Sequence, residues 1–313
     1  MRVCVTGAGG FVGGHLRSCL DRRGHEVVAL VSPRRAAAGD GIATDLVDPG
    51  ATARAVADAQ PDAVIHLAAR ARPAALESMQ ELFDNNVRAV NSVLAAVRCL
   101  GRKVKVIVTS SSAVYGAVPL ARNPIVEEQP LRPVLPYGAT KVAVEAVASV
   151  YAAQGLDVLI VRPFNLLGPR QGPEWVAARF ARQIARIAAG LAESVIETGP
   201  LDSVRDFTDV RDAVRASVAL LEQGTGRRVF NVCSGIPRSV GDLLREMLAL
   251  AEVDAVIRPA SGAGAPPGLD VPYQCGSPAA IAQATGWSPE IEWRVTLRDI
   301  LAEWRGRVDG DAQ

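Results

Sequence analysis

A glycine-rich turn near the start of the chain limits the possible folds more than any other feature. Residues 3–5 read as a short apolar strand, and a helical pattern begins near Phe11. The glycines of this segment, Gly7, Gly10 and Gly13, follow the spacing Gly-x-x-Gly-x-x-Gly. Gly7 permits a tight turn, Gly10 lets backbone N–H groups approach a pyrophosphate, and Gly13 allows close packing of helix and strand. A phosphate here would meet the N-terminus of a helix, so we expect dinucleotide binding rather than a turn used for packing alone.

Strand and helix patterns alternate along the first half of the chain. The strand patterns lie at Val27–Val31, Ala63–Leu67, Val104–Thr109 and Val158–Val161. They are almost entirely apolar rather than alternating, which indicates strands buried on both faces of a parallel sheet. The sequence therefore predicts an α/β fold with a doubly wound parallel sheet of the Rossmann type.

The pattern changes after residue 163. A loop at 168–173 precedes a helix over about Val176–Gly190, the stretch Pro259–Pro272 reads as irregular, and a final helix is expected near Val295–Trp304. We expect a cofactor-binding Rossmann domain over 1–163, with a returning segment near 206–234. Residues 164–205 and 235–313 would form a smaller α/β C-terminal substrate domain.

Charge and cysteine content exclude several classes of protein. The chain has 34 Lys and Arg against 33 Asp and Glu, a net charge of +1, so we expect neither nucleic acid nor a membrane surface as partner. The five cysteines show no paired spacing, which favours reduced thiols over disulfides or a zinc site. No apolar run reaches the roughly 18 residues of a membrane span, and the first residues enter a strand directly. We expect a cytoplasmic enzyme.

Tyr137 and Lys141 lie four residues apart at the start of a long Ala- and Val-rich helical pattern. On a helix this spacing places both side chains on one face. A phenol has a pKa of about 10, and a nearby positive charge is expected to lower it toward neutrality. The pair alone fits a surface lysine equally well, but a serine run at Ser110–Ser112 and the glycine turn favour catalysis.

Several further motifs follow in order. They are Val5 through Gly13, His66-Leu67-Ala68-Ala69, Ser110-Ser111 through Tyr115-Gly116, Tyr137 through Lys141, Arg162-Pro163-Phe164-Asn165, Arg205 through Val210, Asn231 through Gly235, and Thr285-Gly286-Trp287. With these motifs the chain resembles the extended short-chain dehydrogenases/reductases, which include sugar-nucleotide epimerases, dehydratases and reductases. Its later segments look most like the subgroup of GDP-4-keto-6-deoxymannose reductases.

The resemblance implies three catalytic residues. Ser111 stands four positions before the tyrosine of Val-Tyr-Gly, where the family has a hydroxyl that bonds the reacting oxygen. Tyr137 would be the general acid, and Lys141 would lower its pKa and bond the nicotinamide ribose. For Ser110 and Ser112 we expect ordinary capping at the strand end.

The resemblance also implies a set of cofactor-binding residues. They are Gly7, Gly10, Phe11, Val12, Gly13, Arg34, Asp45, Leu46, Leu67, Ala68, Ala69, Asn86, Tyr137, Lys141 and Pro163. Asn86 and Asp45 fit helix caps as well as cofactor contacts. His66 is expected to position the backbone, because a lone histidine without partners does not indicate a metal site.

The end of the second predicted strand bears on the choice of cofactor. NAD enzymes place an acid there for the ribose 2′-hydroxyl, whereas this chain has Val31-Ser32-Pro33-Arg34-Arg35. Guanidinium groups suit a phosphate, so NADP(H) is preferred and NAD(H) is possible. The alternative is a solvated basic loop.

The substrate-binding residues implied by the resemblance are Ser111, Asn165 and Arg205. The last two match positions that hold the diphosphate of a nucleotide sugar. Arg205 could instead form a salt bridge with Asp206 or Asp209.

The residues after Ser111 bear on the reaction. Family dehydratases need an acid close after this position, and here Ser112 and Ala113 follow. We therefore predict an NADP(H)-dependent reductase of a nucleotide-linked 4-keto-6-deoxy sugar, with an NAD-dependent sugar-nucleotide 4-epimerase as the alternative. A cofactor-sensing protein without catalysis is disfavoured, because the serine, tyrosine and lysine are all present.

Two long helices carry the expectation of a homodimer. Relatives pair through helices that match about Glu81–Leu100 and Tyr137–Gln154, and their Ala- and Val-rich faces could form a four-helix bundle. The same faces could instead pack against their own sheet.

Overall fold

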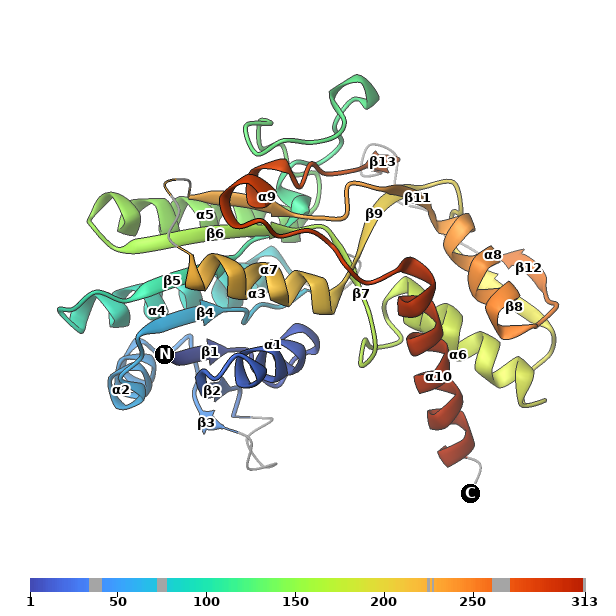
Figure 1. The fold of residues 1–313 in the computed structure, drawn as a ribbon, viewed down its shortest axis with the longest axis horizontal. Coiled ribbons are helices and arrows are strands. Elements are labelled where there is room, and N and C mark those ends of the chain that lie inside the picture. The colour runs from blue at the N-terminus through green and yellow to red at the C-terminus, as the bar shows by residue number, and fades with distance from the viewer. Residues whose placement is uncertain (34–40, 72–77, 224–225, 227, 261–270, 312–313) are drawn as a thin grey trace.

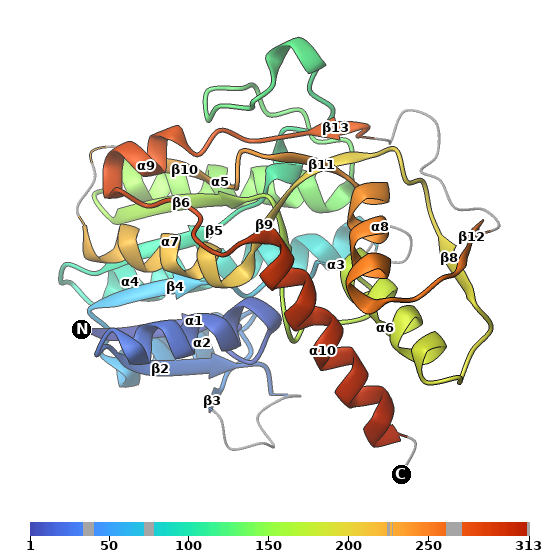
Figure 2. The same cartoon turned by 45° about the vertical axis from the view of Figure 1, so that its right-hand side comes forward.

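The computed structural model describes residues 1–33, 41–71, 78–223, 226, 228–260 and 271–311. A large parallel sheet with its helices forms one part of the molecule, and three helices with short strands form a second part (Figure 1). The second part lies beyond the carboxyl ends of the main-sheet strands, which the arrows mark, and this arrangement persists when the molecule is turned (Figure 2).

The main sheet has seven strands. They are β1 (Arg2–Thr6), β2 (Glu26–Val31), β3 (Ile42–Ala43), β4 (Ala63–His66), β5 (Lys105–Thr109), β6 (Asp157–Pro163) and β10 (Val229–Val232). Their order is β10-β6-β5-β4-β1-β2-β3, and all neighbours are parallel. The chain leaves β1 in one direction and returns to β4 on its other side. The sheet therefore has a topological switch point between β1 and β4, where ligands bind in folds of this class.

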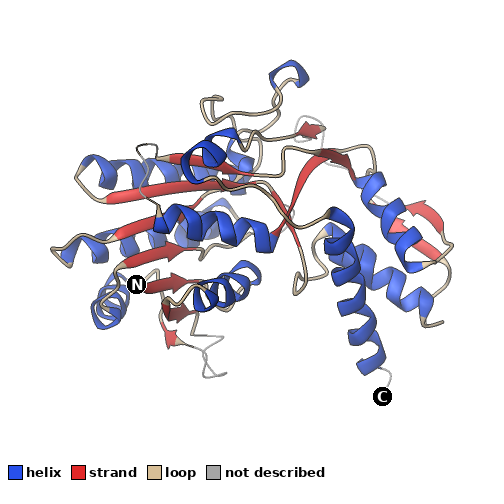
Figure 3. Ribbon diagram, in the orientation of Figure 1, coloured by secondary structure: helices blue, strands red, loops and turns tan. Residues whose placement is uncertain are grey.

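Helices cover both faces of this sheet (Figure 3). They are α1 (Phe11–Arg22), α7 (Val210–Glu222) and α9 (Ala279–Thr285) on one face, and α2 (Pro49–Ala59), α4 (Ala89–Cys99) and α5 (Pro136–Ala153) on the other. Successive strand residues serve opposite cores: Val3 and Val5 pack with the first group of helices and Cys4 with the second. This alternation explains the continuous apolar runs. The predicted doubly wound parallel sheet is confirmed.

The helical run before α4 is not uniform. It begins with α3 (Met79–Phe83), continues as the π-helical segment η2 (Asp84–Arg88) and becomes α4. The sequence predicted an uninterrupted helix over Glu81–Leu100. π-helical turns inside helices are frequent at functional sites, and this one presents Asn86 to the loop after β4.

The second part is built around β9 (Val204–Asp209). This strand pairs with β7 (Asn165–Leu167), β11 (Pro237–Ser239) and β13 (Tyr273–Gln274), while β8 (Val195–Thr198) pairs with β12 (Val256–Pro259). The helices α6 (Val176–Ala188), α8 (Val240–Ala251) and α10 (Trp293–Asp311) enclose a separate core. Strand β10 lies in the main sheet although it follows β9 in the sequence, and the predicted division of the chain into domains stays a prediction.

The final helix is longer than predicted. The sequence indicated Val295–Trp304, whereas α10 continues to Asp311 because Val308 is buried in the same core as Leu301. Two short 3-10 segments, η3 (Ser112–Val114) and η4 (Leu120–Arg122), follow β5. Within the described residues, no helix has the length and apolar character needed to cross a membrane.

Candidate active site

The glycine turn joins the carboxyl end of β1 to the N-terminus of α1. Gly7 has a φ of +70°, and a Cβ atom there would lie 2.8 Å from the backbone nitrogen of Ala68. A Cβ atom on Gly13 would lie 2.3 Å from the carbonyl oxygen of Gly7. Gly10 is the N-cap residue of α1, and no side chain in the described part of the chain caps the helix. The first N–H groups of α1 are therefore available to an anion.

Tyr137 and Lys141 lie in the first two turns of α5. Pro136 occupies the first turn, where its missing N–H is tolerated. Lys141 is only 3% exposed, and its Nζ donates a hydrogen bond of 2.8 Å to the carbonyl oxygen of Thr109. The same Nζ lies 5.7 Å from the centroid of the Tyr137 ring. The end of β5 thus fixes the ammonium group beside the phenol.

The pKa of the tyrosine differs from the sequence-based expectation. The surrounding protein raises the pKa of Tyr137 to about 12, because dehydration disfavours the phenolate, and a hydrogen bond with Ser111 offsets only part of this effect. Burial lowers the pKa of Lys141 to about 8, while the Glu145 carboxylate acts to raise it. The expected lowering of the phenol pKa is therefore wrong, since dehydration of the buried phenol has the larger effect.

Ser111 is the N-cap residue of η3, two residues after the end of β5. Its Oγ accepts a hydrogen bond of 3.1 Å from the backbone N–H of Ala113, which leaves its own proton free to be donated. Ser111 and Tyr137 interact with each other, so the structure brings the three predicted catalytic side chains together around the end of β5.

The neighbouring serines do not cap the strand end, and that prediction is wrong. Ser110 donates to the Glu145 carboxylate, and Ser112 Oγ donates to Gln274 Oε1 at 2.9 Å. Both serines are buried. Their buried hydroxyl groups thus find hydrogen-bond acceptors in the side chains of Glu145 and Gln274.

A buried ion pair between Arg162 in β6 and Glu145 in α5 lies beside the site, and the sequence analysis did not predict this pair. Arg162 donates from Nε and Nη2 to the two carboxylate oxygens of Glu145, at 2.8 and 2.6 Å. Its Nη1 donates to the Tyr115 hydroxyl at 2.8 Å, and Tyr115 in turn donates to Asn231. The signals in the sequence were an acid one turn after Lys141 and an arginine within an apolar strand, both of which are rarely buried unless paired.

Asn86 connects the loop after β4 to α5. Its Oδ1 accepts from the backbone N–H of Arg70 at 2.8 Å, and its Nδ2 donates to Thr140 Oγ1 at 3.1 Å. Thr140 Oγ1 donates to the carbonyl oxygen of Tyr137 at 2.8 Å. The capping alternative for Asn86 is excluded, because Ser78 caps this helical run. A contact between Asn86 and a cofactor stays a prediction.

The predicted residues of the adjacent loops lie around the switch point. Leu67, Ala68 and Ala69 follow β4, and Thr6 Oγ1 bonds His66 Nδ1 at 2.8 Å and accepts from the N–H of Ala68. Burial lowers the pKa of His66 to about 3, so the imidazole is neutral and orders the backbone.

The remaining cofactor candidates lie at the rim. Phe11 and Val12 form the first turn of α1, Leu46 packs on the core under α2, and Pro163 ends β6. Asp45 is exposed, and its carboxylate accepts from the N–H of Val47, whereas Asp48 caps α2. The capping alternative for Asp45 is therefore wrong. Arg34 lies outside the described residues.

The two predicted diphosphate ligands lie on paired strands. Asn165 begins β7, and its Nδ2 donates to the carbonyl oxygen of Asp206 in β9 at 3.3 Å. Arg205, also in β9, donates to the carbonyl oxygen of Val204. Both acids that were considered as salt-bridge partners of Arg205 bind other groups. Asp209 pairs with Arg211, and the Asp206 carboxylate accepts from the N–H groups of residues 234, 235 and 276.

The local polar groups fit a bound dinucleotide. Thr109 Oγ1 is buried and has no hydrogen-bond partner among the described residues, and it belongs to the residue whose carbonyl oxygen holds Lys141. Such an orphan group suits a ligand that brings its own donors or acceptors. The uncapped N-terminus of α1 suits the pyrophosphate.

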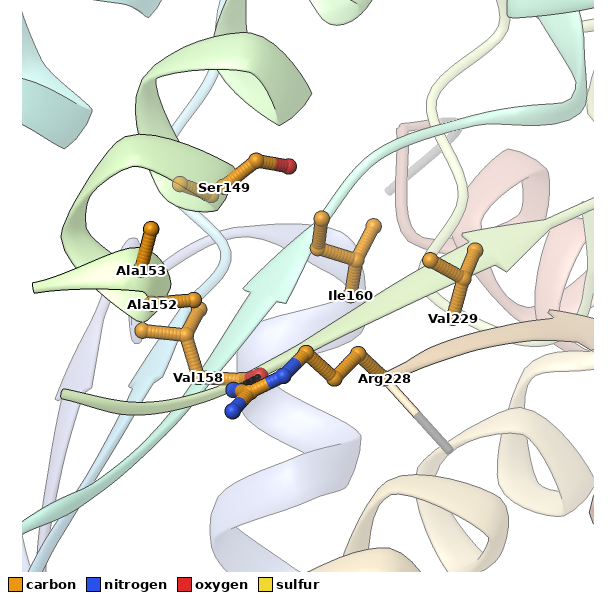
Figure 4. A pocket seen from close by; sticks show the side chains of 8 residues that line it. Ser149, Ala152, Ala153, Val158, Ile160, Arg228 and Val229 are labelled. Carbon is orange, nitrogen blue, oxygen red and sulfur yellow. Dashed lines mark hydrogen bonds between the residues drawn. The ribbon is translucent and has the colours of Figure 1, made fainter. Parts of the chain in front are cut away.

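A cavity of about 250 Å³ lies away from this chemistry. It is lined by Ala148, Ser149, Ala152, Ala153, Val158, Ile160, Arg228 and Val229, between the far end of α5 and strands β6 and β10 (Figure 4). Ser149 lies eight residues beyond Lys141, roughly 12 Å along the helix, so this cavity is separate from the candidate active site.

The sequence matches the NAD dependent epimerase/dehydratase family over residues 3–233. It is 35% identical over 311 residues to GDP-6-deoxy-D-mannose reductase of Pseudomonas aeruginosa, with 98% of each chain covered. It is 33% identical to UDP-glucose 4-epimerase of Mycolicibacterium smegmatis over 78% of this chain and 80% of that one. The structure superposes on that of RMD from Pseudomonas aeruginosa complexed with NADPH, with a TM-score of 0.87, 35% identity and 98% of each chain covered.

Proposed function

We propose that this chain, which belongs to the NAD dependent epimerase/dehydratase family, is an NADP(H)-dependent reductase of a nucleotide-linked 4-keto-6-deoxy sugar. The observation that carries the proposal is the 35% identity, over 98% of both chains, to a GDP-6-deoxy-D-mannose reductase. The grouping of Ser111, Tyr137 and Lys141 at the end of β5 supports it, because these residues suit proton donation to a carbonyl oxygen.

The reduction divides between cofactor and protein. NADPH would supply the hydride that adds to the carbonyl carbon. Tyr137 would give its proton to the carbonyl oxygen as charge develops there, so that C=O becomes CH–OH. With a pKa of about 12 the phenol holds its proton at neutral pH, which is the state a reductase requires. Ser111 would donate a hydrogen bond to the same oxygen.

Lys141 would act through charge and position. Its ammonium is fixed by the carbonyl oxygen of Thr109, and its remaining hydrogens could bond the hydroxyl groups of the nicotinamide ribose. Once the phenol begins to lose its proton, the positive charge of Lys141 would stabilise the phenolate.

The diphosphate of the substrate would bind at Arg205 and Asn165. Both residues lie on adjacent strands beyond the carboxyl end of the main sheet. The proposal of a guanosine base rests on the relative that shares 35% identity.

The preference for NADPH has two supports. The structural relative from Pseudomonas aeruginosa was determined as a complex with NADPH. In this chain, β2 ends without an acid that could accept a bond from a ribose 2′-hydroxyl, and Arg34 follows within a few residues.

A 4-epimerase is the second candidate. It is favoured by the relatives that are UDP-glucose 4-epimerases, one of them 33% identical. Ser111, Tyr137 and Lys141 serve that reaction equally well. Dehydration is disfavoured, because Ser112 and Ala113 supply no carboxylic acid after Ser111.

We also propose a homodimer formed by a four-helix bundle. Helices α4 and α5 each pack one face on their own sheet, as the alternative interpretation proposed, and apolar side chains stay exposed on α5 and on α3. On α5 these are Ala146, Val150 and Ala153, and on the neighbouring α3 they are Met79 and Phe83. The spacing of three and four residues places each set on one face.

The cysteines support a reducing compartment such as the cytoplasm. All five are free, and Cys4, Cys19, Cys233 and Cys275 are buried, while Cys99 is exposed at the end of α4.

The test is the consumption of NADPH by the purified protein. It would be mixed with 4-keto-6-deoxy sugars linked to GDP, dTDP or UDP, and the absorbance of reduced nicotinamide followed. Stoichiometric loss with one of them would support the reductase and identify the base. No loss with any, together with NAD that copurifies and stays bound, would instead support the epimerase.

A further inference from the structure

Gln274 reaches from the second part of the molecule into the catalytic loop. Its side chain is 6% exposed and makes two hydrogen bonds to one residue. Gln274 Oε1 accepts from Ser112 Oγ at 2.9 Å, and Gln274 Nε2 donates to the carbonyl oxygen of Ser112 at 3.1 Å. Ser112 directly follows Ser111, so this amide holds the residue next to the proposed oxygen ligand.

The backbone of Gln274 is joined to the proposed diphosphate site. Strand β13 pairs with β9, and Gln274 lies opposite Arg205 in the register. Just before and after this position, Val204 N–H donates to Pro272 and Gly276 N–H donates to the buried Asp206 carboxylate. One residue therefore connects the strand of Arg205 with the loop of Ser111.

The same segment is fastened to the loop after η4. Ile125 N–H donates to the carbonyl oxygen of Cys275 at 2.8 Å, and Cys275 N–H donates to Asn123 Oδ1 at 3.0 Å. These bonds hold β13 in place whatever the side chain at position 274. Replacing that side chain would thus release Ser112 without detaching the strand.

We propose that Gln274 is a positioning residue, which sets the direction of the Ser111 hydroxyl relative to a substrate held by Arg205. The inference rests on the proposed reductase function. The carbonyl oxygen of Ser112 accepts from both Gln274 Nε2 and the N–H of Tyr115, so the amide fixes the whole η3 turn that begins at Ser111. A hydrogen-bond donor stabilises the transition state only where it points at the atom on which charge develops. A small displacement of that donor therefore lowers the rate of the reaction.

The test is a double-mutant cycle between Gln274→Met and Ser111→Ala. Methionine keeps the shape of glutamine and removes both hydrogen bonds. In the wild-type background, Gln274→Met is expected to lower kcat about tenfold with NADPH affinity unchanged. In the Ser111→Ala background, the same change is expected to lower kcat less than about twofold, because its effect passes through Ser111.

Gln183→Met is the matched control. Gln183 on α6 also makes a two-point contact with backbone, donating to the carbonyl oxygen of Glu197 and accepting from its N–H. It lies outside the catalytic loop and its contacts are exposed to solvent, so Gln183→Met is expected to leave kcat unchanged at a smaller cost in stability. An equal loss of kcat from Gln274→Met in both backgrounds, or an equal loss in the control, would overturn the inference.

A second measurement does not depend on turnover. Amide hydrogen exchange of residues 110–116 is expected to be faster in Gln274→Met than in the wild type, and unchanged in Gln183→Met. If the wild type consumes no NADPH with any keto sugar, the proposed function fails, while the exchange experiment still decides whether Gln274 orders the Ser111 loop. Unchanged exchange in Gln274→Met would contradict the inference.

Discussion

Lys141 is held by the main chain of Thr109: its Nζ donates to that carbonyl oxygen at 2.8 Å. The ammonium therefore has a fixed place beside the Tyr137 ring, at the carboxyl end of β5. Because burial lowers the pKa of Lys141 to about 8, this ammonium group loses its proton only slightly above neutral pH.

Replacement of Tyr137 by phenylalanine is expected to lower kcat by about 10²- to 10⁴-fold, the usual contribution of a general acid. NADPH affinity should change less than about twofold, because the ring remains. Stopped-flow measurement of NADPH oxidation and fluorescence titration would separate the two effects. Tyr151→Phe is the control: this residue lies on the same helix, but its hydroxyl bonds Asn91. Comparable losses in both variants would contradict the assigned role.

The pH dependence should follow Lys141. The pKa of its ammonium is lowered to about 8, so the positive charge is present below pH 8 and is lost as the pH rises through that value. The Tyr137 phenol, with a pKa of about 12, stays protonated over the same range. We therefore expect kcat/KM to fall above about pH 8. In Lys141→Met the remaining activity should show no such decline, and a decline at the same pH in that variant would assign it to another group.

Glu145→Gln should affect both stability and this pH profile. The change leaves Arg162 buried without its ion-pair partner, which typically costs about 3–5 kcal/mol of unfolding free energy. It also removes the carboxylate that raises the pKa of Lys141, so the decline in kcat/KM should move to lower pH. Urea unfolding and a pH profile would measure these effects.

An exposed ion pair provides the control for Glu145→Gln. Arg245 pairs with Asp242 on the surface of α8, and Arg245→Ala should cost less than about 1 kcal/mol. A Glu145→Gln variant as stable as Arg245→Ala, with an unshifted pH profile, would show that the buried pair has no role in the site.

Two glycines in helices should respond in opposite directions to alanine. In Gly13→Ala the new Cβ atom would meet the Gly7 carbonyl oxygen at 2.3 Å, so the turn must open and NADPH binding should be lost or strongly weakened. Outside its own helix, no atom of the described residues lies within 4 Å of a Cβ atom added to Gly306 in α10. Gly306→Ala should therefore stabilise the protein by about 0.5–1 kcal/mol. Calorimetry of cofactor binding and thermal melts would test both, and normal NADPH affinity in Gly13→Ala would contradict the assigned turn.

The sequence predicted those features that depend on local pattern. Continuous apolar runs predicted the parallel strands, because a strand such as β5 sends successive side chains into two cores. The four-residue spacing of Tyr137 and Lys141 likewise survives in α5. The Glu145–Arg162 pair and the contact of Gln274 with Ser112 join residues far apart in the chain, and no spacing rule predicts such contacts.

The predictions of the Tyr137 pKa and of the end of α10 were wrong because a local sequence pattern contains no information on burial in the folded protein. The pKa of Tyr137 was judged from one nearby charge, whereas dehydration by the folded protein has the larger effect. The final helix was predicted near Val295–Trp304, yet burial of Val308 in the core of the second part extends α10 to Asp311. Tertiary packing overrides helix propensity there.

The proposed dimer makes the last prediction. Val150 is 56% exposed on the outer face of α5, next to Ala146 and Ala153, and a charge there would have to be buried in a four-helix bundle. We expect the wild type to show twice the chain mass of 32.9 kDa by light scattering, and Val150→Glu to show the mass of one chain. Leu191→Glu, at an exposed apolar position after α6, should leave the mass unchanged. A wild-type mass of 32.9 kDa would exclude the dimer, and a dimeric Val150→Glu would place the interface on another face.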